Sequence, residues 1–423
     1  MTEAMTDLRT QITAAYTERW HDSPNTVLLA PGRINLIGDH TDYSLLPVLP
    51  MAIQYGIAFA AGAGGDASGG SGITVNSLND PAELTVSADG STAASRPASW
   101  HRYVEIALNY LDPRPDGARI LLTGDLPLTG GLSSSSALVV GLLAAASAVN
   151  EQQGRGSALA GQALADAAVA AERMAAIEGG AMDQTIIVFG VEGAAVRLDF
   201  DPPARRTVTI PDGLALIAAY SGEQAAKGAS AKDEYNTRVV ACRAATALLA
   251  AELGMDAPDP LVLGRLGAVP ASALDVLPLT SSAAEVSAKT GIPLADLVSM
   301  SAGDFSPEAV VPIRAVAKHV VAEAGAVDAM EPALAAADFE TVGNLLNASH
   351  QSLRSFGSST QALDALCAAV VGAGALGARV TGAGFGGYAI AACQAEDLGQ
   401  VLTAAEATTG GPAFEVTASS GIA

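Results

Sequence analysis

Strand-like and helix-like segments mix along this chain without a regular alternation of β and α. Short β-branched runs such as "TVLLAPGRINLIGDH" and "VLPMAIQYGIAFAAG" come first, followed by "ARILLTG" and a long apolar helical segment. Several helical segments, among them "PEAVVPIRAVAKHVVAEAGAVDAM", lie between "LALIAAY" and the last strand-like runs. A doubly wound parallel sheet needs strands and helices in strict succession, so the pattern predicts an α+β fold.

Length predicts more than one hydrophobic core. The chain has 423 residues, half of them apolar, and single cores stop growing below this size. The run "DPPARR" at 201–206 is a turn signal between two strand-like segments. We therefore predict two domains, residues 1–205 and residues 206–423.

Charge and apolar run length exclude several classes of partner. The formal net charge of −22 repels nucleic acid and anionic lipid surfaces. The longest apolar runs, which begin at Ala137 and Leu366, stop at 13 residues, whereas about 20 are needed to span a bilayer. The acidic N-terminus has no apolar segment typical of a signal peptide, and the three cysteines show no CxxC spacing. We expect a cytoplasmic monomer that binds neither nucleic acid nor membrane.

The glycine- and serine-rich loop "LPLTGGLSSSSALVVGLL" carries the clearest chemical signal. Gly130 and Gly131 permit close backbone approach, and Ser133–Ser136 lead into an apolar helix, an arrangement that suits phosphate. One serine is enough to cap a helix, so the longer run favours anion binding over capping. No GK[ST] follows, and the first lysine of the chain is Lys227. Neutralisation of a bound phosphate would therefore fall to backbone dipoles, arginine or a metal ion.

A second glycine-rich loop, "TGAGFGGYAIA", contains G-x-G-x-x-G at Gly382, Gly384 and Gly387. A dinucleotide fingerprint precedes a helix, whereas a strand-like run follows here. The spacing predicts a hairpin whose glycines pack against a neighbouring loop.

Ionisable residues crowd the stretch "PGRINLIGDHTDYS", which begins at Pro31. Either it is a charged, solvated turn, or its side chains converge on a polar ligand. Asp183, which precedes the apolar run "TIIVFG", raises a similar choice between a helix cap and a base or metal ligand. The residues alone leave both choices open.

Three stretches taken in order, "PGRINLIGDHTDY", "LPLTGGLSSSSA" and "RVTGAGFGGY", resemble the three motifs of the GHMP small-molecule kinases. The first closely resembles the galactokinase signature, and the likeness continues through "AERMAAIEGGAMDQ" and "DEYNTRVVACRAATALL" to the final "ASSGIA". The resemblance implies a two-domain GHMP-kinase fold with its active site in the cleft between the domains. It also implies transfer of the ATP γ-phosphoryl group, with Mg²⁺, to the anomeric hydroxyl of galactose or a close relative.

Carried across position by position, the resemblance implies a role for each matching residue. Asp183 would be the catalytic base and Arg33 its electrostatic partner. The residues implied to contact the sugar are Asp39, His40, Asp42, Gly180 and Tyr235. The residues implied to bind ATP are Gly130, Gly131, Leu132, Ser133, Ser134 and Ser135 at the phosphates and Trp100 near the adenine. Ser135 and Glu172 would hold Mg²⁺ through hard oxygen donors.

Several positions depart from the galactokinase pattern and leave the sugar open. Asp39 stands where the family has the longer Glu, at the position expected to reach the C6 hydroxyl. Ser44, Leu45, Leu46 and Thr129 replace glycines, and "EGGAMDQ" is similar to the N-acetylgalactosamine kinase and plant-type galactokinase versions. The alternatives are therefore an N-acetylgalactosamine or other galactose-type 1-kinase, or a non-catalytic sugar and ATP sensor. A homoserine or mevalonate kinase is disfavoured, because those carboxylate substrates would prefer a basic pocket to "HTDY".

Overall fold

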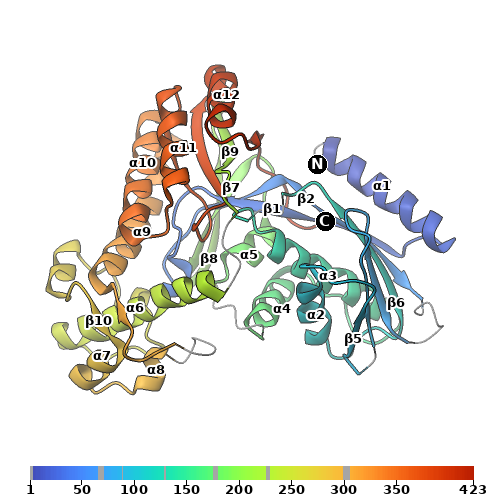
Figure 1. The fold of residues 1–423 in the computed structure, drawn as a ribbon, viewed down its shortest axis with the longest axis horizontal. Coiled ribbons are helices and arrows are strands. Elements are labelled where there is room, and N and C mark those ends of the chain that lie inside the picture. The colour runs from blue at the N-terminus through green and yellow to red at the C-terminus, as the bar shows by residue number, and fades with distance from the viewer. Residues whose placement is uncertain are drawn as a thin grey trace.

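Two sheets covered by helices organise the chain (Figure 1), which is the predicted α+β class. The computed structural model describes residues 3–64, 71–87, 89–127, 130–174, 180–224, 229–298 and 305–423. The six-stranded sheet has the order β1 (Thr26–Asn35), β2 (Pro50–Ala63), β6 (Ala118–Gly124), β3 (Ile73–Ser77), β4 (Glu83–Val86) and β5 (Thr92–Ala94). The four-stranded sheet has the order β12 (Gly377–Val380), β13 (Tyr388–Gln394), β9 (Leu214–Tyr220) and β14 (Ala413–Val416). All neighbouring strands run antiparallel except β3 and β6.

Helices cover both faces of the six-stranded sheet, which explains why β2 is apolar on both sides from Gly56 to Ala63. Ala58 and Ala60 pack with α1 (Glu3–Trp20), whereas Phe59 belongs to the main core with α3 (Ser134–Gln152). Successive residues of a strand point to opposite faces, so a doubly covered sheet shows no apolar–polar alternation. The helices that pack beside α3 are α2 (His101–Tyr110), α4 (Gly161–Met174) and α5 (Met182–Phe189).

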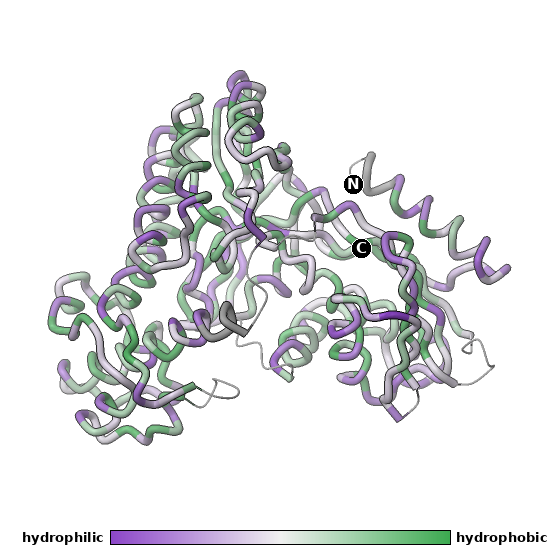
Figure 2. The backbone as a smooth tube through the Cα atoms, in the orientation of Figure 1, coloured by the Kyte–Doolittle hydropathy of each residue, from purple (hydrophilic) through white to green (hydrophobic). Residues whose placement is uncertain are grey.

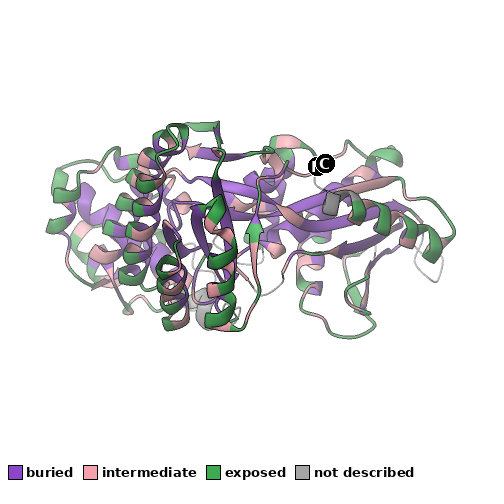
Figure 3. Ribbon diagram, turned by 90° about the horizontal axis from the view of Figure 1, so that it is seen from above, coloured by how far each residue is buried: buried purple, intermediate pink, exposed green. Residues whose placement is uncertain are grey.

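Helix α3 is the one described helix that is long and apolar enough to cross a membrane. Of its most apolar window, 78% is buried inside the protein. Figure 3 shows this buried interior continuing through the strands, with exposed residues on the outer helix faces. The helix is thus a core element, since a buried core helix has the same apolar composition as a membrane span.

The second half of the chain packs helices against the four-stranded sheet. Ile217 and Ala391 on one face contact α11 (Gln361–Gly372) and α12 (Leu398–Thr409), while the other face joins the main core. Helices α9 (Ile313–Ala335) and α10 (Phe339–Phe356) pack together, and α10 also lies on β12. In Figure 2 these helices alternate between hydrophilic and hydrophobic along their length, as helices with one buried face do.

A smaller helical lobe projects from the long helix α6 (Ala229–Leu253) and has its own apolar cluster. Its other elements are the short helices η2 (Leu263–Leu266) and η3 (Ala271–Val276), the pair β10 (Ser281–Ser282) and β11 (Val310–Val311), and the helices α7 (Ala283–Thr290) and α8 (Leu294–Val298). The prediction of helix from 307 onward is wrong at its start. Val310 and Val311 form β11, and α9 begins only after Pro312, because the residue before a proline is biased away from helix.

The predicted turn in "DPPARR" is also shorter than expected. Asp201 and Pro202 form the turn, but residues 203–206 already belong to β8 (Pro203–Thr209), which pairs with β7 (Ala194–Phe200). Strand β8 is exposed along most of its length, so its sequence lacks the apolar alternation by which strands are recognised.

The two ends of the chain meet at the first sheet, as Figures 1 and 3 show. Leu29 and Ala423 exchange backbone hydrogen bonds of 2.9 and 3.3 Å, and Ala418 bridges to Ile53 in β2. Arg9 of α1 donates to the carbonyl of Val27 at 3.1 Å and to that of Ala423. The last residues of the chain therefore pack with the N-terminal sheet.

Candidate active site

A bulge in β1 presents Arg33 to Asp183. The register of β1 on β2 shifts between Pro31 and Arg33, and a Cβ at Gly32 would lie 2.4 Å from Leu126 Cδ1, so only glycine fits there. Arg33 is 4% exposed, and its Nε and Nη2 donate to the two carboxylate oxygens of Asp183 at 2.8 and 2.9 Å. This two-pronged, charge-assisted pair joins β1 to α5.

Asp183 lies in the first turn of α5 but does not cap it. The N-cap position is Ala181, which makes no side-chain cap, so the helix-cap alternative for Asp183 is wrong. Instead the carboxylate accepts from Arg33 and from the hydroxyl of Ser133.

The predicted phosphate loop has the strained backbone of a ligand cradle. Gly130 and Gly131 have φ of 100° and 95°, and Ser133 at the N-cap of α3 has φ of 57° and caps nothing through its side chain. The first N–H groups of α3, which begins at Ser134, therefore lack that common partner. Buried Leu132 accepts from the backbone N–H of Arg33 at 3.1 Å, while Leu128 and Thr129 lie outside the described residues.

The second glycine-rich loop supports the first, as predicted. Strands β12 and β13 form an antiparallel hairpin, and a Cβ at Gly382 would lie 3.2 Å from the Gly131 carbonyl oxygen. Arg33 Nη1 donates to that same carbonyl at 2.6 Å. The hairpin prediction is therefore confirmed, and the loop it packs against is the phosphate loop.

Residues 35–43, which we call the 35–43 loop, begin at the last residue of β1 and carry most of the predicted sugar contacts. Asp42 accepts from the backbone N–H groups of Tyr43 at 3.0 Å and Met182 at 3.3 Å. Gly180 lies directly against this carboxylate, since a Cβ there would be 1.8 Å from Asp42 Oδ2. Burial, aided by the charge of Asp183, raises the pKa of Asp42 to about 6. Asp42, Gly180 and Asp183 are thus brought together.

Asp39 is almost fully buried, at 1% exposure, and is held by two side chains. Asn35 Nδ2 donates to its Oδ1 at 3.0 Å, and Arg379 pairs with its Oδ2. Burial raises the pKa of Asp39, and the Arg379 charge is the largest of the effects that oppose this shift. Sequence reasoning missed Arg379. The available signal was a charged residue between apolar neighbours in "ARV", because a buried strand arginine needs a carboxylate.

The His40 ring is uncharged in this site. Its Nε2–H donates to the Ala383 carbonyl at 3.1 Å, and burial, together with His319, lowers its pKa to about 3. Its ring lies 4.6 Å from that of Phe356 and 5.6 Å from that of Tyr235, measured between centroids. Its Nδ1 is buried with no hydrogen-bond partner among the described residues. The predicted His40 and Tyr235 therefore form one aromatic wall.

The C-terminal half of the chain holds the 35–43 loop through hydrogen bonds to its first residues. Thr381 Oγ1 accepts from the Asn35 N–H at 3.1 Å, and Arg379 Nη1 donates to the Leu36 carbonyl at 3.0 Å. Glu323 accepts from the Gly38 N–H at 3.0 Å, and His319 Nε2–H donates to the Asp39 carbonyl at 3.2 Å. Sequence reasoning did not identify these supports.

Glu172 has the properties of a metal ligand. It is 7% exposed, and burial raises its pKa to about 7, although hydrogen bonding from Ser136 and Gln184 opposes that shift. Its Oε1 is buried without a hydrogen-bond partner in the described part of the chain. Ser135 lies beside Ser136 in the first turn of α3. One or two carboxylates with a hydroxyl, completed by water and phosphate, suit Mg²⁺.

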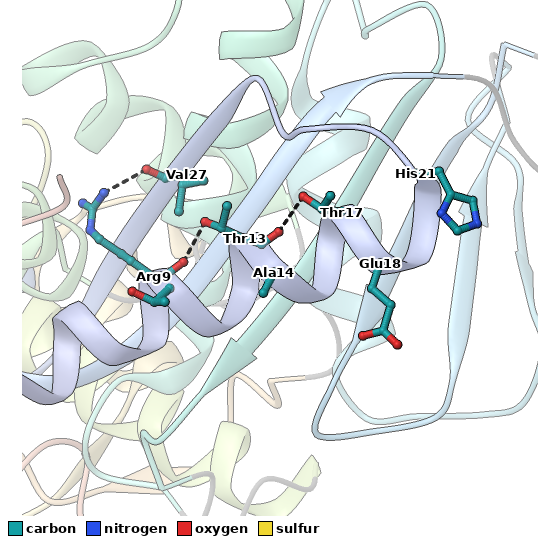
Figure 4. Close-up of a pocket in the computed structure, with 8 residues that line it drawn as sticks. Arg9, Thr13, Ala14, Thr17, Glu18, His21 and Val27 are labelled. Atoms are coloured by element: carbon teal, nitrogen blue, oxygen red, sulfur yellow. Dashed lines mark hydrogen bonds between the residues drawn. The ribbon is translucent and has the colours of Figure 1, made fainter.

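Two further features lie outside this cluster. Trp100 is at the N-cap of α2, packs edge-on against His101 with ring centroids 4.4 Å apart, and has a buried Nε1 without a partner among the described residues. Its place near adenine stays a prediction. A shallow pocket of about 1020 Å³, open to solvent, runs along α1 (Figure 4), lined by threonines with Arg9, Glu18 and His21, and it includes none of the predicted site residues.

Comparisons with known proteins identify the family of this chain. Family models match at residues 14–63 (galactokinase galactose-binding signature), 102–191 (GHMP kinases N terminal domain) and 330–409 (GHMP kinases C terminal). The galactokinase of Chloroflexus aggregans is 30% identical over 93% of this chain and 90% of its own length. The galactokinase of Mycobacterium tuberculosis is 30% identical over 90% of this chain and 93% of its own.

The fold is also shared with solved structures. Galactokinase from Lactococcus lactis complexed with galactose superposes with a TM-score of 0.73 at 23% identity, covering 98% of this chain and 99% of that one. Mevalonate kinase from Methanococcus jannaschii gives a TM-score of 0.58 at 16% identity, covering 93% and 98%. At these identities the likeness concerns the fold.

Proposed function

The chain belongs to the galactokinase family of the GHMP kinases, and we propose that it transfers the γ-phosphoryl group of ATP to the anomeric hydroxyl of galactose. The observation that carries the proposal is the Arg33–Asp183–Ser133 cluster. It lies where the phosphate loop and the 35–43 loop meet, and it offers a carboxylate with a fixed charge partner. A phosphoryl-transfer site requires a positioned base beside an anion cradle.

Asp183 would take the proton of the C1 hydroxyl as the sugar oxygen attacks phosphorus. The two-pronged contact with Arg33 orients the Asp183 carboxylate and places positive charge beside the transferring group. Phosphoryl transfer has a loose transition state, so catalysis is mostly positioning and neutralisation of charge. No lysine precedes Lys227, and the N–H groups of residues 131–135 would therefore bind the phosphate oxygens together with Arg33.

The sugar would lie against Asp39, His40, Asp42, Gly180 and Tyr235. Asp42 would accept hydrogen bonds from neighbouring ring hydroxyls, which favours its charged form over the protonated one. Gly180 permits close approach because any side chain there would overlap Asp42. The wall of His40 and Tyr235 would flank the apolar face of the ring.

Mg²⁺ would be held by Glu172 and Ser135, with Ser136 and Gln184 orienting the carboxylate. When bound, the ion supplies neutralisation of the phosphate oxygens. The indole of Trp100 would lie near the adenine. We also propose a cytoplasmic monomer without nucleic-acid or membrane partners, a proposal supported by the net charge of −22.

One observation favours a second candidate, a kinase for N-acetylgalactosamine or another galactose-type sugar. Asp39, the shorter residue at the position expected to reach C6, is tied to Arg379 and Asn35. A sensor without activity is less well supported, because a sensor has no need for the Arg33–Asp183 pair.

The test is ADP release with Mg-ATP across galactose, N-acetylgalactosamine, galacturonate, 6-deoxygalactose, arabinose and glucose, with the position of the product phosphate determined by NMR. We expect the highest kcat/KM for galactose and a 1-phosphate product. A higher kcat/KM for another galactose-type sugar would establish the second candidate. Binding of ATP and a sugar without any turnover would overturn the enzymatic proposal in favour of a sensor.

A further inference from the structure

Arg379 has no role in the mechanism above, although it is the largest fully buried side chain among the described residues. It projects from β12 into the 35–43 loop, where it pairs with Asp39 Oδ2 and donates to the Leu36 carbonyl at 3.0 Å. A fully buried guanidinium is stable only with a paired charge and satisfied hydrogen bonds. Asp39 is the carboxylate that pairs with this buried charge, while Arg379 Nε has no partner among the described residues.

We propose that Arg379 is a positioning residue for sugar recognition, and that it sets the orientation of the Asp39 carboxylate and with it the preference at C6. This inference rests on the proposed function. A carboxylate has about four acceptor positions, and Asn35 and Arg379 each occupy one. In this proposal a sugar hydroxyl takes one of the remaining positions, and the two contacts fix where they point.

Only the planar, two-pronged guanidinium of arginine can hold both hydrogen-bond acceptors of Arg379, because they are different groups. One is the Asp39 side chain and the other is the backbone carbonyl of Leu36, three positions earlier. By joining them, Arg379 also sets the curvature of the loop between these residues. A lysine would keep the charge but bind as a single point, so it could not hold both acceptors in the same geometry.

The charged and titratable groups that face Asp39 define the expected pH behaviour. They are Arg379 from β12, Arg33 from β1, His319 and Glu323 from α9, and Asp42 within the loop. Among them Arg379 opposes the burial-driven rise of the Asp39 pKa most strongly. Removal of Arg379 would raise that pKa further. Asp39 would then lose its charge at a higher pH. The fall of kcat/KM for the sugar on the acidic side of the pH profile would therefore also occur at a higher pH.

The experiment compares Arg379→Lys, Arg379→Met and the double variant Asp39→Asn/Arg379→Met with the unaltered protein. Arg197→Met is the matched control, because Arg197 is also buried and ion-paired but lies on the β7–β8 hairpin. The readouts are the sugar KM, the ATP KM, kcat, thermal unfolding and the dependence of kcat/KM for the sugar on pH.

We expect Arg379→Lys to raise the sugar KM about 10-fold and Arg379→Met about 100-fold, the range for a lost charged hydrogen bond. The ATP KM should stay within about twofold, and the acidic limb of Arg379→Met should move to higher pH. The double variant should recover thermal stability, because no buried charge is left unpaired, yet keep the high sugar KM. Arg197→Met should lower thermal stability without changing the sugar KM.

Two results would overturn the inference. One is an unchanged sugar KM in Arg379→Lys and in the double variant. These two variants leave no buried charge unpaired, so they still test the inference if Arg379→Met fails to fold. The other is an equal rise of the sugar KM and the ATP KM, which is expected of a purely structural residue. The unaltered protein separates the two proposals. If it phosphorylates no sugar, the proposed function fails, and sugar affinity by calorimetry then tests Arg379 in the same variants.

The preference at C6 gives a second readout. Asp39→Glu adds one methylene between the backbone and the carboxylate that Arg379 holds. We expect the ratio of kcat/KM for galactose to that for 6-deoxygalactose to change several-fold. An unchanged ratio would remove Asp39, and with it Arg379, from recognition of C6.

Discussion

The phosphate loop and the 35–43 loop adjoin each other, but they are built in opposite ways. The phosphate loop has its ligand-facing shape in its own backbone, with left-handed conformations at Gly130, Gly131 and Ser133 and the start of α3, and other segments only brace it. The 35–43 loop is held by side chains that lie between 280 and 346 positions away along the chain. One is encoded locally, and the other is assembled only by the complete fold.

This difference divides the proposed site into a part that binds phosphate and a part that recognises the sugar. A cradle of backbone N–H groups binds any phosphate, and a mevalonate kinase at 16% identity shares the fold that carries it. A loop held by Arg379, His319 and Glu323 can change its ligand preference through single substitutions in a distant strand or helix. We therefore expect substitutions in the two regions to affect different substrates.

The largest expected effect is at Asp183, which accepts from Ser133 of the phosphate loop and adjoins Met182, whose N–H donates to Asp42 of the 35–43 loop. Asp183→Asn keeps the shape of the side chain but removes the base, so kcat should fall about 10²- to 10⁴-fold. Single-turnover rates measure the loss, while calorimetry should find the sugar and ATP still bound. Asp275→Asn, in an exposed ion pair with Lys318, is the matched control and should leave kcat unchanged. Substantial activity in Asp183→Asn would eliminate it as the base.

A smaller effect is expected at Glu172, on the phosphate side. Its carboxyl has a pKa of about 7 because of burial, so a proton must leave before Mg²⁺ binds. The apparent Mg²⁺ affinity should therefore rise about tenfold per pH unit below pH 7 and level off above it. Titrations with Mg²⁺ at constant ATP between pH 5.5 and 8.5 measure this dependence.

Glu172→Gln supplies the comparison for that titration. It should weaken Mg²⁺ binding about 10- to 100-fold and abolish the pH dependence. Burial raises the folded pKa to about 7, above the unfolded value, so the metal-free protein loses stability as the pH rises from the unfolded pKa to the folded one, and the loss is complete above pH 7. Glu172→Gln should thus melt at a higher temperature at pH 8. The same pH dependence in both proteins would show that Glu172 does not hold the metal.

Sequence patterns predicted the locally encoded parts of the fold and site well. The strand before the phosphate loop, the loop itself, α3 and the β12–β13 hairpin all follow from glycines, serines and apolar runs within a short window. Helix α1 was not predicted. Among its described side chains only Ile12 and Tyr16 are buried, and two apolar positions are too few to give a clear helical periodicity.

The supports of the 35–43 loop could not be predicted for a different reason. Arg379, Glu323 and His319 are each ordinary in their local sequence, and their roles arise from packing of β12 and α9 against the loop. Periodicity and turn signals describe neighbours along the chain, and these contacts are not between neighbours. Asp183 was ambiguous for the same reason, since its partners Arg33 and Ser133 decide its role.

The smallest expected effect tests whether the phosphate loop is a separate unit. Gly131 has φ of 95°, and a Cβ there would lie 3.2 Å from the Tyr388 nitrogen, so Gly131→Ala should distort the cradle at a cost of about 1–2 kcal/mol. The ATP KM should rise about 5- to 10-fold, while the sugar KM stays within about twofold. Gly154→Ala is the matched control. Gly154 also has a positive φ, 68°, but open space surrounds it, so alanine there adds backbone strain without a steric clash. If Gly131→Ala raised the sugar KM as much as the ATP KM, the two loops would act as one unit, since Gly131 also contacts Arg33 and the hairpin that carries Gly382.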